Sequence, residues 1–158
     1  MPRASEKWVI ADTHFNHPML VVKGYRPPDY EQRIIDNWKK MVHPDDVIFH
    51  LGDVIMRSQS MLGGIMEQLP GHKILVRGNH DRQSIFWFIK RGFSAVVDSL
   101  RLDEIYMTHE PSQLIPGTTA NLHGHTHGDD HREHTVEDFQ QEVSIESSFM
   151  PFPLDVFR

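Results

Sequence analysis

Five short apolar runs in this chain each end, within three residues, on a side chain that can bind a metal ion. Runs of this length, rich in β-branched residues and closed by turn-forming residues, are typical of buried strands. They occupy residues 8–11, 47–51, 74–76, 105–107 and 121–122, and the residues that follow them include Asp12, His14, Asp53, Asn79, His80, His109, His125 and His127. In open α/β sheets, sites form at the carboxyl ends of the strands. A single metal site built from five strand ends would explain the whole pattern.

The segments between the early runs have helical periodicity. Residues 31–42 place five apolar side chains on one face, and residues 58–69 and 82–91 repeat the pattern. Ser58 or Ser60 is a candidate N-cap of the second helix. The β-α-β-α-β order predicts parallel strands with right-handed crossovers. The helix-poor second half, with strands expected at 94–98, 101–108 and 143–145, indicates antiparallel pairing.

We therefore predict an α/β protein in which mixed β-sheets form a central sandwich flanked by helices. A length of 158 residues favours a single domain over residues 1–158. Residues 15–30 and 110–118 are rich in proline and glycine and are expected to be loops. The polar segment 128–141 is expected to be an exposed hairpin or a mobile loop, and Pro151 and Pro153 predict an irregular tail.

Composition disfavours several classes of protein. The mean hydropathy of -0.45 and the lack of any apolar run near 18 residues argue against a membrane span. No leader pattern is visible, so we expect a cytoplasmic protein. The net charge of -6 disfavours a nucleic-acid polymer as substrate, because such proteins usually present a basic face. A small phosphoester remains compatible, since bound cations reverse the local field.

Each motif alone has an ordinary structural interpretation. Asp12 and His14, like His125 and His127, are two residues apart, so in an extended segment both side chains of a pair point the same way. Asp53 after Gly52 could equally form an Asx-turn or cap a helix. His109 alone would more often be a partly buried histidine than a ligand. Their order along the chain, each at a strand end, favours the metal site.

The string D-x-H, G-D, G-N-H-D, H, G-H-x-H resembles the calcineurin-like metallophosphoesterase superfamily, and the resemblance runs from Asp12 to His127. The opening residues 12–17 and Arg26-Pro27 are similar to the small phosphoesterases of bacteria and their phages. The resemblance implies two divalent cations bridged by Asp53, and a metal-bridging hydroxide that attacks phosphorus. One cation would take Asp12, His14, Asp53 and His127, and the other Asp53, Asn79, His109 and His125. Ligands without sulfur suit Mn²⁺, which we favour, and also Fe, Co²⁺, Ni²⁺ or Zn²⁺.

The resemblance also suggests roles beyond the ligands. His80 matches the histidine that protonates the leaving group or stabilises the transition state, so we assign catalysis to His80 and Asp53. Arg57 matches a phosphate-binding arginine, and His17 and Arg26 are candidate substrate contacts at the rim. His50 and His123, inside strands, are expected to support ligand histidines. The protein Ser/Thr phosphatases of the superfamily carry aspartate where this chain has Met56, and glutamate where it has Asp81.

These departures disfavour a protein phosphatase. We expect a phosphodiesterase acting on small or nucleotidic phosphoesters. The alternatives are a phosphomonoesterase, a non-catalytic protein-interaction scaffold with the same fold, and a nuclease with a local basic groove. Assembly into a homo-oligomer is left open.

Overall fold

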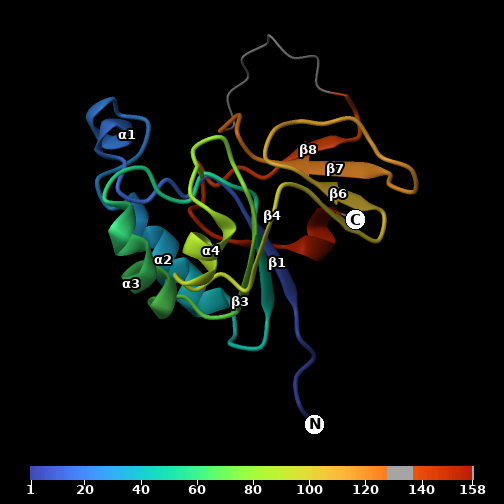
Figure 1. Ribbon diagram of the computed structural model, residues 1–158, viewed down its shortest axis with the longest axis horizontal. Coiled ribbons are helices and arrows are strands. Elements are labelled where there is room, and N and C mark those ends of the chain that lie inside the picture. The colour runs from blue at the N-terminus through green and yellow to red at the C-terminus, as the bar shows by residue number, and fades with distance from the viewer. Residues whose placement is uncertain (128–136, 158) are drawn as a thin grey trace.

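The computed structural model describes residues 1–127 and 137–157. Two β-sheets lie at its centre (Figure 1). The first sheet has the order β4-β3-β2-β1-β9, formed by β1 Lys7–Ile10, β2 Val47–His50, β3 His72–Val76, β4 Ala95–Val97 and β9 Phe152–Pro153. Strands β1 to β4 pair in parallel, so their carboxyl ends lie along one edge. Parallel pairing was predicted for β1 to β3, whereas β4 belongs to the half in which antiparallel pairing was expected.

The expected irregular tail instead adds a strand, because Phe152–Pro153 pairs antiparallel with β1. A proline is tolerated there, since β9 lies at the edge of the sheet.

The second sheet has the order β5-β6-β7-β8, with β5 Leu100–Leu102, β6 Ile105–Met107, β7 Ala120–His123 and β8 Gln140–Glu142. It corrects two predictions. The strand expected at 101–108 is a hairpin of β5 and β6, turned at Asp103, which has a φ of 53°. The second half is also less antiparallel than expected, because β6, β7 and β8 pair in parallel.

The final predicted strand falls slightly earlier, at 140–142 rather than 143–145. Most of the segment 128–141, where a hairpin or loop is expected, lies outside the described residues.

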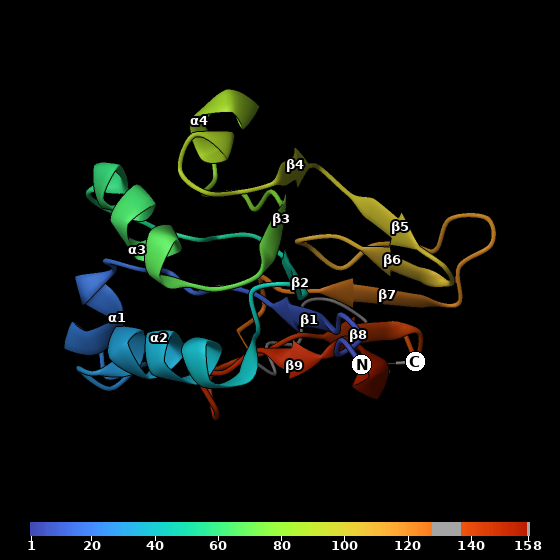
Figure 2. The ribbon, with the colours of Figure 1, turned by 90° about the horizontal axis from the view of Figure 1, so that it is seen from below.

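Four α-helices gather on one side of the first sheet, and the second sheet lies on the other (Figure 2). They are α1 Pro18–Val22, α2 Tyr30–Met41, α3 Leu62–Gln68 and α4 Ile85–Ile89, with 3₁₀ turns η1 Gln59–Met61 before α3 and η2 Leu154–Phe157 at the end. The three predicted helices are present. Ser58 does not cap one, because its φ of 49° is left-handed and its side chain makes no capping bond. Helix α1 lies in the expected loop and begins at Pro18, where proline's missing N–H costs nothing.

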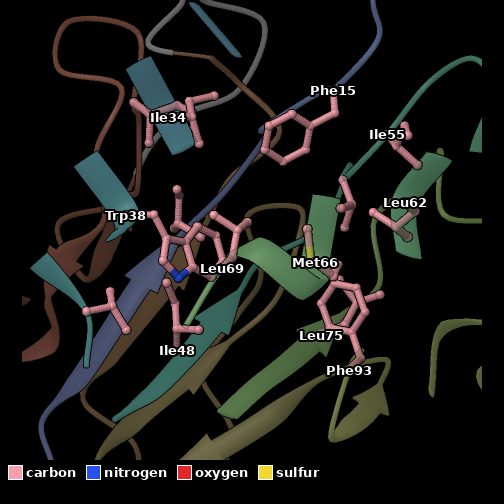
Figure 3. Close-up of a cluster of buried hydrophobic side chains, with 14 of the residues drawn as sticks. Phe15, Ile34, Trp38, Ile48, Ile55, Leu62, Met66, Leu69, Leu75 and Phe93 are labelled. Atoms are coloured by element: carbon pink, nitrogen blue, oxygen red, sulfur yellow. The ribbon is translucent and has the colours of Figure 1, made fainter. Parts of the chain in front are cut away.

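Alternation along the strands divides the core into two layers. Trp8 and Ile10 of β1 face the helices, whereas Val9 and Ala11 face the second sheet. Figure 3 shows part of the helix-side layer, in which Trp38 of α2 lies beside Ile48 of β2. With both faces of β1 buried, its continuous apolar composition is explained. The predicted α/β architecture of mixed sheets flanked by helices is thus confirmed.

Candidate metal centre

The loop after β1 brings Asp12 and His14 together by an unexpected route. Both residues have left-handed backbones, with φ of 52° and 44°, so the segment is not extended as the spacing argument assumed. Their amides are fixed by the next loop, because Asp12 N donates to Gly52 O and His14 N to Asp53 O, each at 3.0 Å. Asp and His adopt this conformation more readily than bulky or branched residues. The two side chains converge nonetheless.

The first cluster consists of Asp12, His14 and His127, whose potential ligand atoms all lie within 4.8 Å of one another. His14 Nε2 is 3.1 Å from His127 Nε2, and Asp12 Oδ1 is 3.6 Å from His127 Nε2. Asp12 Oδ2 accepts a hydrogen bond from the His125 amide at 2.8 Å, whereas the buried Oδ1 has no hydrogen-bond partner. A buried, unpaired carboxylate oxygen is costly. Beside two imidazole nitrogens, it fits a divalent cation.

The second cluster consists of Asp53, His109 and His125, again within 4.8 Å, together with Asn79. Asn79 Oδ1 is 2.9 Å from His109 Nε2 and 3.2 Å from His125 Nδ1. His109 Nδ1 lies 2.6 Å from Leu51 O, which can accept a hydrogen bond from the Nδ1–H group and so leave the Nε2 lone pair facing the cluster. These oxygen and nitrogen donors, without sulfur, suit divalent transition metals.

Asp53 of the second cluster also lies close to the first cluster. Its Oδ1 accepts a hydrogen bond from the His80 amide at 3.0 Å. Its Oδ2 is 3.6 Å from His14 Nε2 of the first cluster and 3.4 Å from His109 Nε2 of the second. One carboxylate oxygen therefore faces both candidate cation positions.

Glycine permits the close packing of these loops. A Cβ on Gly124 would lie 2.6 Å from Asp12 Oδ2 and 2.8 Å from Ala11 Cβ. Gly52 has a φ of 98°, and its Cβ would lie 2.6 Å from His109 Nδ1. Any side chain at either position would displace a candidate ligand.

Burial and mutual charge perturb the metal-free cluster strongly. Burial raises the pKa of Asp12 to about 7 and lowers the pKa of His14 to about 2. Burial also acts on His109 and Asp53, but their hydrogen bond and opposite charges outweigh it. The pKa of His109 consequently rises to about 9 and that of Asp53 falls to about 2. Neighbouring side chains whose pKa values are strongly shifted are typical of functional sites.

His80, His17 and Arg57 surround the clusters. His80 is 39% exposed, and its Nε2 lies 3.9 Å from Asp53 Oδ2. The His17 ring centroid is 5.5 Å from that of His14. Burial, followed by the charges of His80, Arg26 and Arg57, lowers the pKa of His17, so these groups lie near one another. The side chain of Arg57 is exposed, while its backbone carbonyl accepts a hydrogen bond from Asn16.

The expected substrate contact of Arg26 is not what the structure shows. Its side chain has no exposed surface, and it donates to the carbonyl oxygens of Thr13 and Asp12 at 2.9 and 2.7 Å. Its remaining bonds go to Glu146. A guanidinium enclosed in this way supports the β1 loop and does not reach a substrate.

Two carboxylates near the clusters were not predicted as site residues. Glu146 Oε1 lies 3.0 Å from His127 Nδ1. Asp81 accepts hydrogen bonds from the amides of Asp53, Val54 and Gly78, and so ties the loop after β2 to the loop after β3. Asp81 stood inside a recognised motif, whereas Glu146 has no neighbouring motif to mark it.

His50 and His123 are buried in strands, as expected. His50 supports the loops rather than a ligand histidine. Its Nε2 lies 2.9 Å from Thr13 Oγ1, and its Nδ1 accepts a hydrogen bond from the Gly52 amide.

Comparison with known families matches residues 7–151 to the calcineurin-like phosphoesterase model. The chain belongs to this family. The two His/Asp clusters are its candidate metal sites. Among the described residues, no helix is both long and apolar enough to cross a bilayer.

Curated relatives match part of the chain. An uncharacterized protein of Methanocaldococcus jannaschii is 32% identical over 81 residues, covering 48% of this chain and 46% of that protein. The gene 66 protein of Mycobacterium phage D29 is 32% identical over 82 residues, covering 49% of this chain and 41% of the phage protein. These matches therefore span less than half the length of either relative.

Two solved structures share the fold. A protein of unknown function from Aquifex aeolicus, AQ665, has a TM-score of 0.74 at 23% identity and covers 94% of this chain and 95% of its own. The Pseudomonas putida nuclease MPE has a TM-score of 0.54 at 22% identity, and the match covers 77% of this chain and 61% of the nuclease.

Proposed function

We propose that this chain is a dinuclear metal-dependent phosphodiesterase that acts on small or nucleotidic substrates. The observation that carries the proposal is the position of Asp53, whose Oδ2 lies 3.6 Å from a donor of one cluster and 3.4 Å from a donor of the other. A shared carboxylate is suited to hold two cations side by side. When bound, two such cations supply Lewis-acid stabilisation of the phosphoryl charge and lower the pKa of a coordinated water.

The chain's own residues then bind and orient the ester. We assign Asp12, His14, Asp53 and His127 to one cation and Asp53, Asn79, His109 and His125 to the other. Arg57 and His17 would contact phosphate oxygens. His80, partly exposed beside Asp53, would give a proton to the leaving alkoxide.

A cavity beside the clusters supports the preference for diesters. It has a volume of about 330 Å³ and is lined by Asn16, His17, Pro18, Val21, Val22, Pro28, Tyr30 and Glu31. His17 therefore borders both the cavity and, through its ring contact with His14, the first cluster. A diester bound there could place its second ester group against the apolar wall of α1. A monoester has no second ester group to occupy this cavity.

The test is hydrolysis of bis-p-nitrophenyl phosphate and p-nitrophenyl phosphate, side by side, by EDTA-stripped protein with and without Mn²⁺. We expect no turnover without metal and faster turnover of the diester when Mn²⁺ is restored. Asp53→Asn serves as the control that assigns activity to this site. A monoester preference of more than about tenfold would make the protein a phosphatase.

Two further outcomes separate the remaining alternatives. Cleavage of single-stranded DNA in preference to the small diester would indicate a nuclease. Folded protein that binds metal yet cleaves none of the three substrates would instead support a scaffold.

A further inference from the structure

We propose that Glu146 is a positioning residue that orients His127 toward the first cation, and that Arg26 fixes Glu146 to the loop carrying Asp12 and His14. The inference rests on the proposed two-cation centre. It predicts that the two cation positions differ, because the first depends on Glu146 and Arg26 and the second does not.

The Glu146 carboxylate joins a candidate ligand to a buried guanidinium. Its Oε1 lies 3.0 Å from His127 Nδ1 and 2.6 Å from an Arg26 terminal nitrogen, while its Oε2 accepts from Arg26 Nε at 3.0 Å. An acceptor at Nδ1 keeps the proton on that nitrogen. The Nε2 lone pair then faces Asp12 and His14, at 3.6 Å from Asp12 Oδ1.

Arg26 also binds the loop that supplies Asp12 and His14, the other two members of the first cluster. Its two terminal nitrogens donate to the carbonyl oxygens of Thr13 and Asp12, and its guanidinium carbon lies 5.0 Å from the centre of the Tyr30 ring. One guanidinium thus holds both the segment that supplies Asp12 and His14 and the carboxylate that holds His127. These segments come from different sheets, so their relative placement depends on this bridge.

The second cluster is supported differently. His109 directs its Nδ1 to a backbone carbonyl, Leu51 O, at 2.6 Å. The side-chain hydrogen bonds of Arg26 and Glu146 join the two residues to each other, to His127 and to the loop of Asp12, not to Asn79, His109 or His125. Loss of the Glu146 charge should therefore weaken one cation and spare the other.

The test is a calorimetric titration of metal-stripped protein with Mn²⁺, comparing wild type with Glu146→Gln and Glu146→Asp. Removing a carboxylate that supports a metal-bound histidine typically lowers affinity about 10–100-fold. We expect that loss for one of two Mn²⁺ ions in Glu146→Gln, with partial recovery in Glu146→Asp. Turnover of the diester by Glu146→Gln should return at high Mn²⁺, which general structural damage would not allow. Asp98→Asn is the matched control, because Asp98 also pairs with an arginine, Arg77, but at an exposed site.

A second measurement does not depend on how the Glu146 variants fold, because the signal is read in the wild type. Long-range ¹H–¹⁵N NMR of the wild type with Mg²⁺ or Zn²⁺ should show His127 with its proton on Nδ1, assigned by its loss in His127→Gln. A proton on Nε2 would overturn the inference, as would equal weakening of both cations or of neither in Glu146→Gln. Wild-type protein that binds no pair of Mn²⁺ ions would overturn the proposed function as well.

Discussion

At the scale of single residues, the centre depends on backbone conformations that most side chains avoid. Asp12, His14, Asp53, His125 and His127 all have positive φ, between 44° and 69°. Each such residue costs on the order of 1–3 kcal/mol, which the surrounding bonds must offset. The sequence could identify these residues because their types and order are unusual. It could not reveal that left-handed turns, rather than extended segments, aim their side chains.

Substitution of Asp53 should reduce metal binding, whereas substitution of His80 should reduce turnover. Asp53→Asn should weaken both cations, because its carboxylate faces both clusters. His80→Ala should keep both cations and lower kcat about 10²–10⁴-fold, since the side chain is assigned to proton transfer and not to metal. Elemental analysis and diester turnover on the same samples check both statements. A cation missing from His80→Ala would show that the role given to His80 is wrong.

The affinity for metal should rise with pH. In the metal-free protein the pKa of Asp12 is about 7 and that of His109 about 9, and both groups must lose their protons to bind a cation. Raising the pH removes this competition, so Mn²⁺ affinity should increase about tenfold per pH unit for each proton displaced between pH 6 and 8.5. Calorimetry in buffers of different ionisation enthalpy counts the released protons. A Mn²⁺ affinity that stays constant or falls over this pH range would contradict the raised pKa values of Asp12 and His109.

At the scale of elements, the site depends on how neighbouring loops are joined. Strand positions were predictable because apolar runs stop at polar residues, and helix α2 because its apolar face repeats regularly. The hairpin at 100–107 was missed because its turn at Asp103 carries no glycine or asparagine signal. The roles of Arg26 and Glu146 depend on contact across 120 residues of sequence, which local patterns cannot reveal.

Asp81 joins the loop after β2 to the loop after β3, and this contact can be tested by one substitution. Asp81→Asn replaces a carboxylate that accepts three backbone amides at 2.7 to 3.1 Å with an uncharged group that also donates. We expect a loss of about 2–4 kcal/mol in the free energy of unfolding. For a chain of this size that corresponds to a Tm lower by about 5–10 °C. Urea denaturation and thermal melts measure both, and the exposed Asp98→Asn should change stability by less than about 0.5 kcal/mol.

At the scale of the whole molecule, the cations would join the two sheets. Asp12, His14, Asp53 and Asn79 follow strands of the first sheet, whereas His109, His125 and His127 follow strands of the second. The sequence predicted that the strand ends meet but not that two sheets contribute them in this way, because β6 and β7 pair in parallel although no helix lies between them in residues 108–119. Mn²⁺ at about 100 times its Kd should therefore stabilise the fold by about 2.7 kcal/mol per site, visible as a higher Tm. Asp53→Asn should lose most of that rise, and an equal rise in this variant would place the binding elsewhere.

The most direct measurement is electron paramagnetic resonance of metal-stripped protein to which Mn²⁺ is added in steps. If Asp53 bridges two cations, a spin-coupled signal should grow as the second Mn²⁺ binds, reach its maximum at two per chain, and disappear in Asp53→Asn. Isolated Mn²⁺ signals alone at every ratio, or saturation at one ion per chain, would contradict a centre shared by two cations.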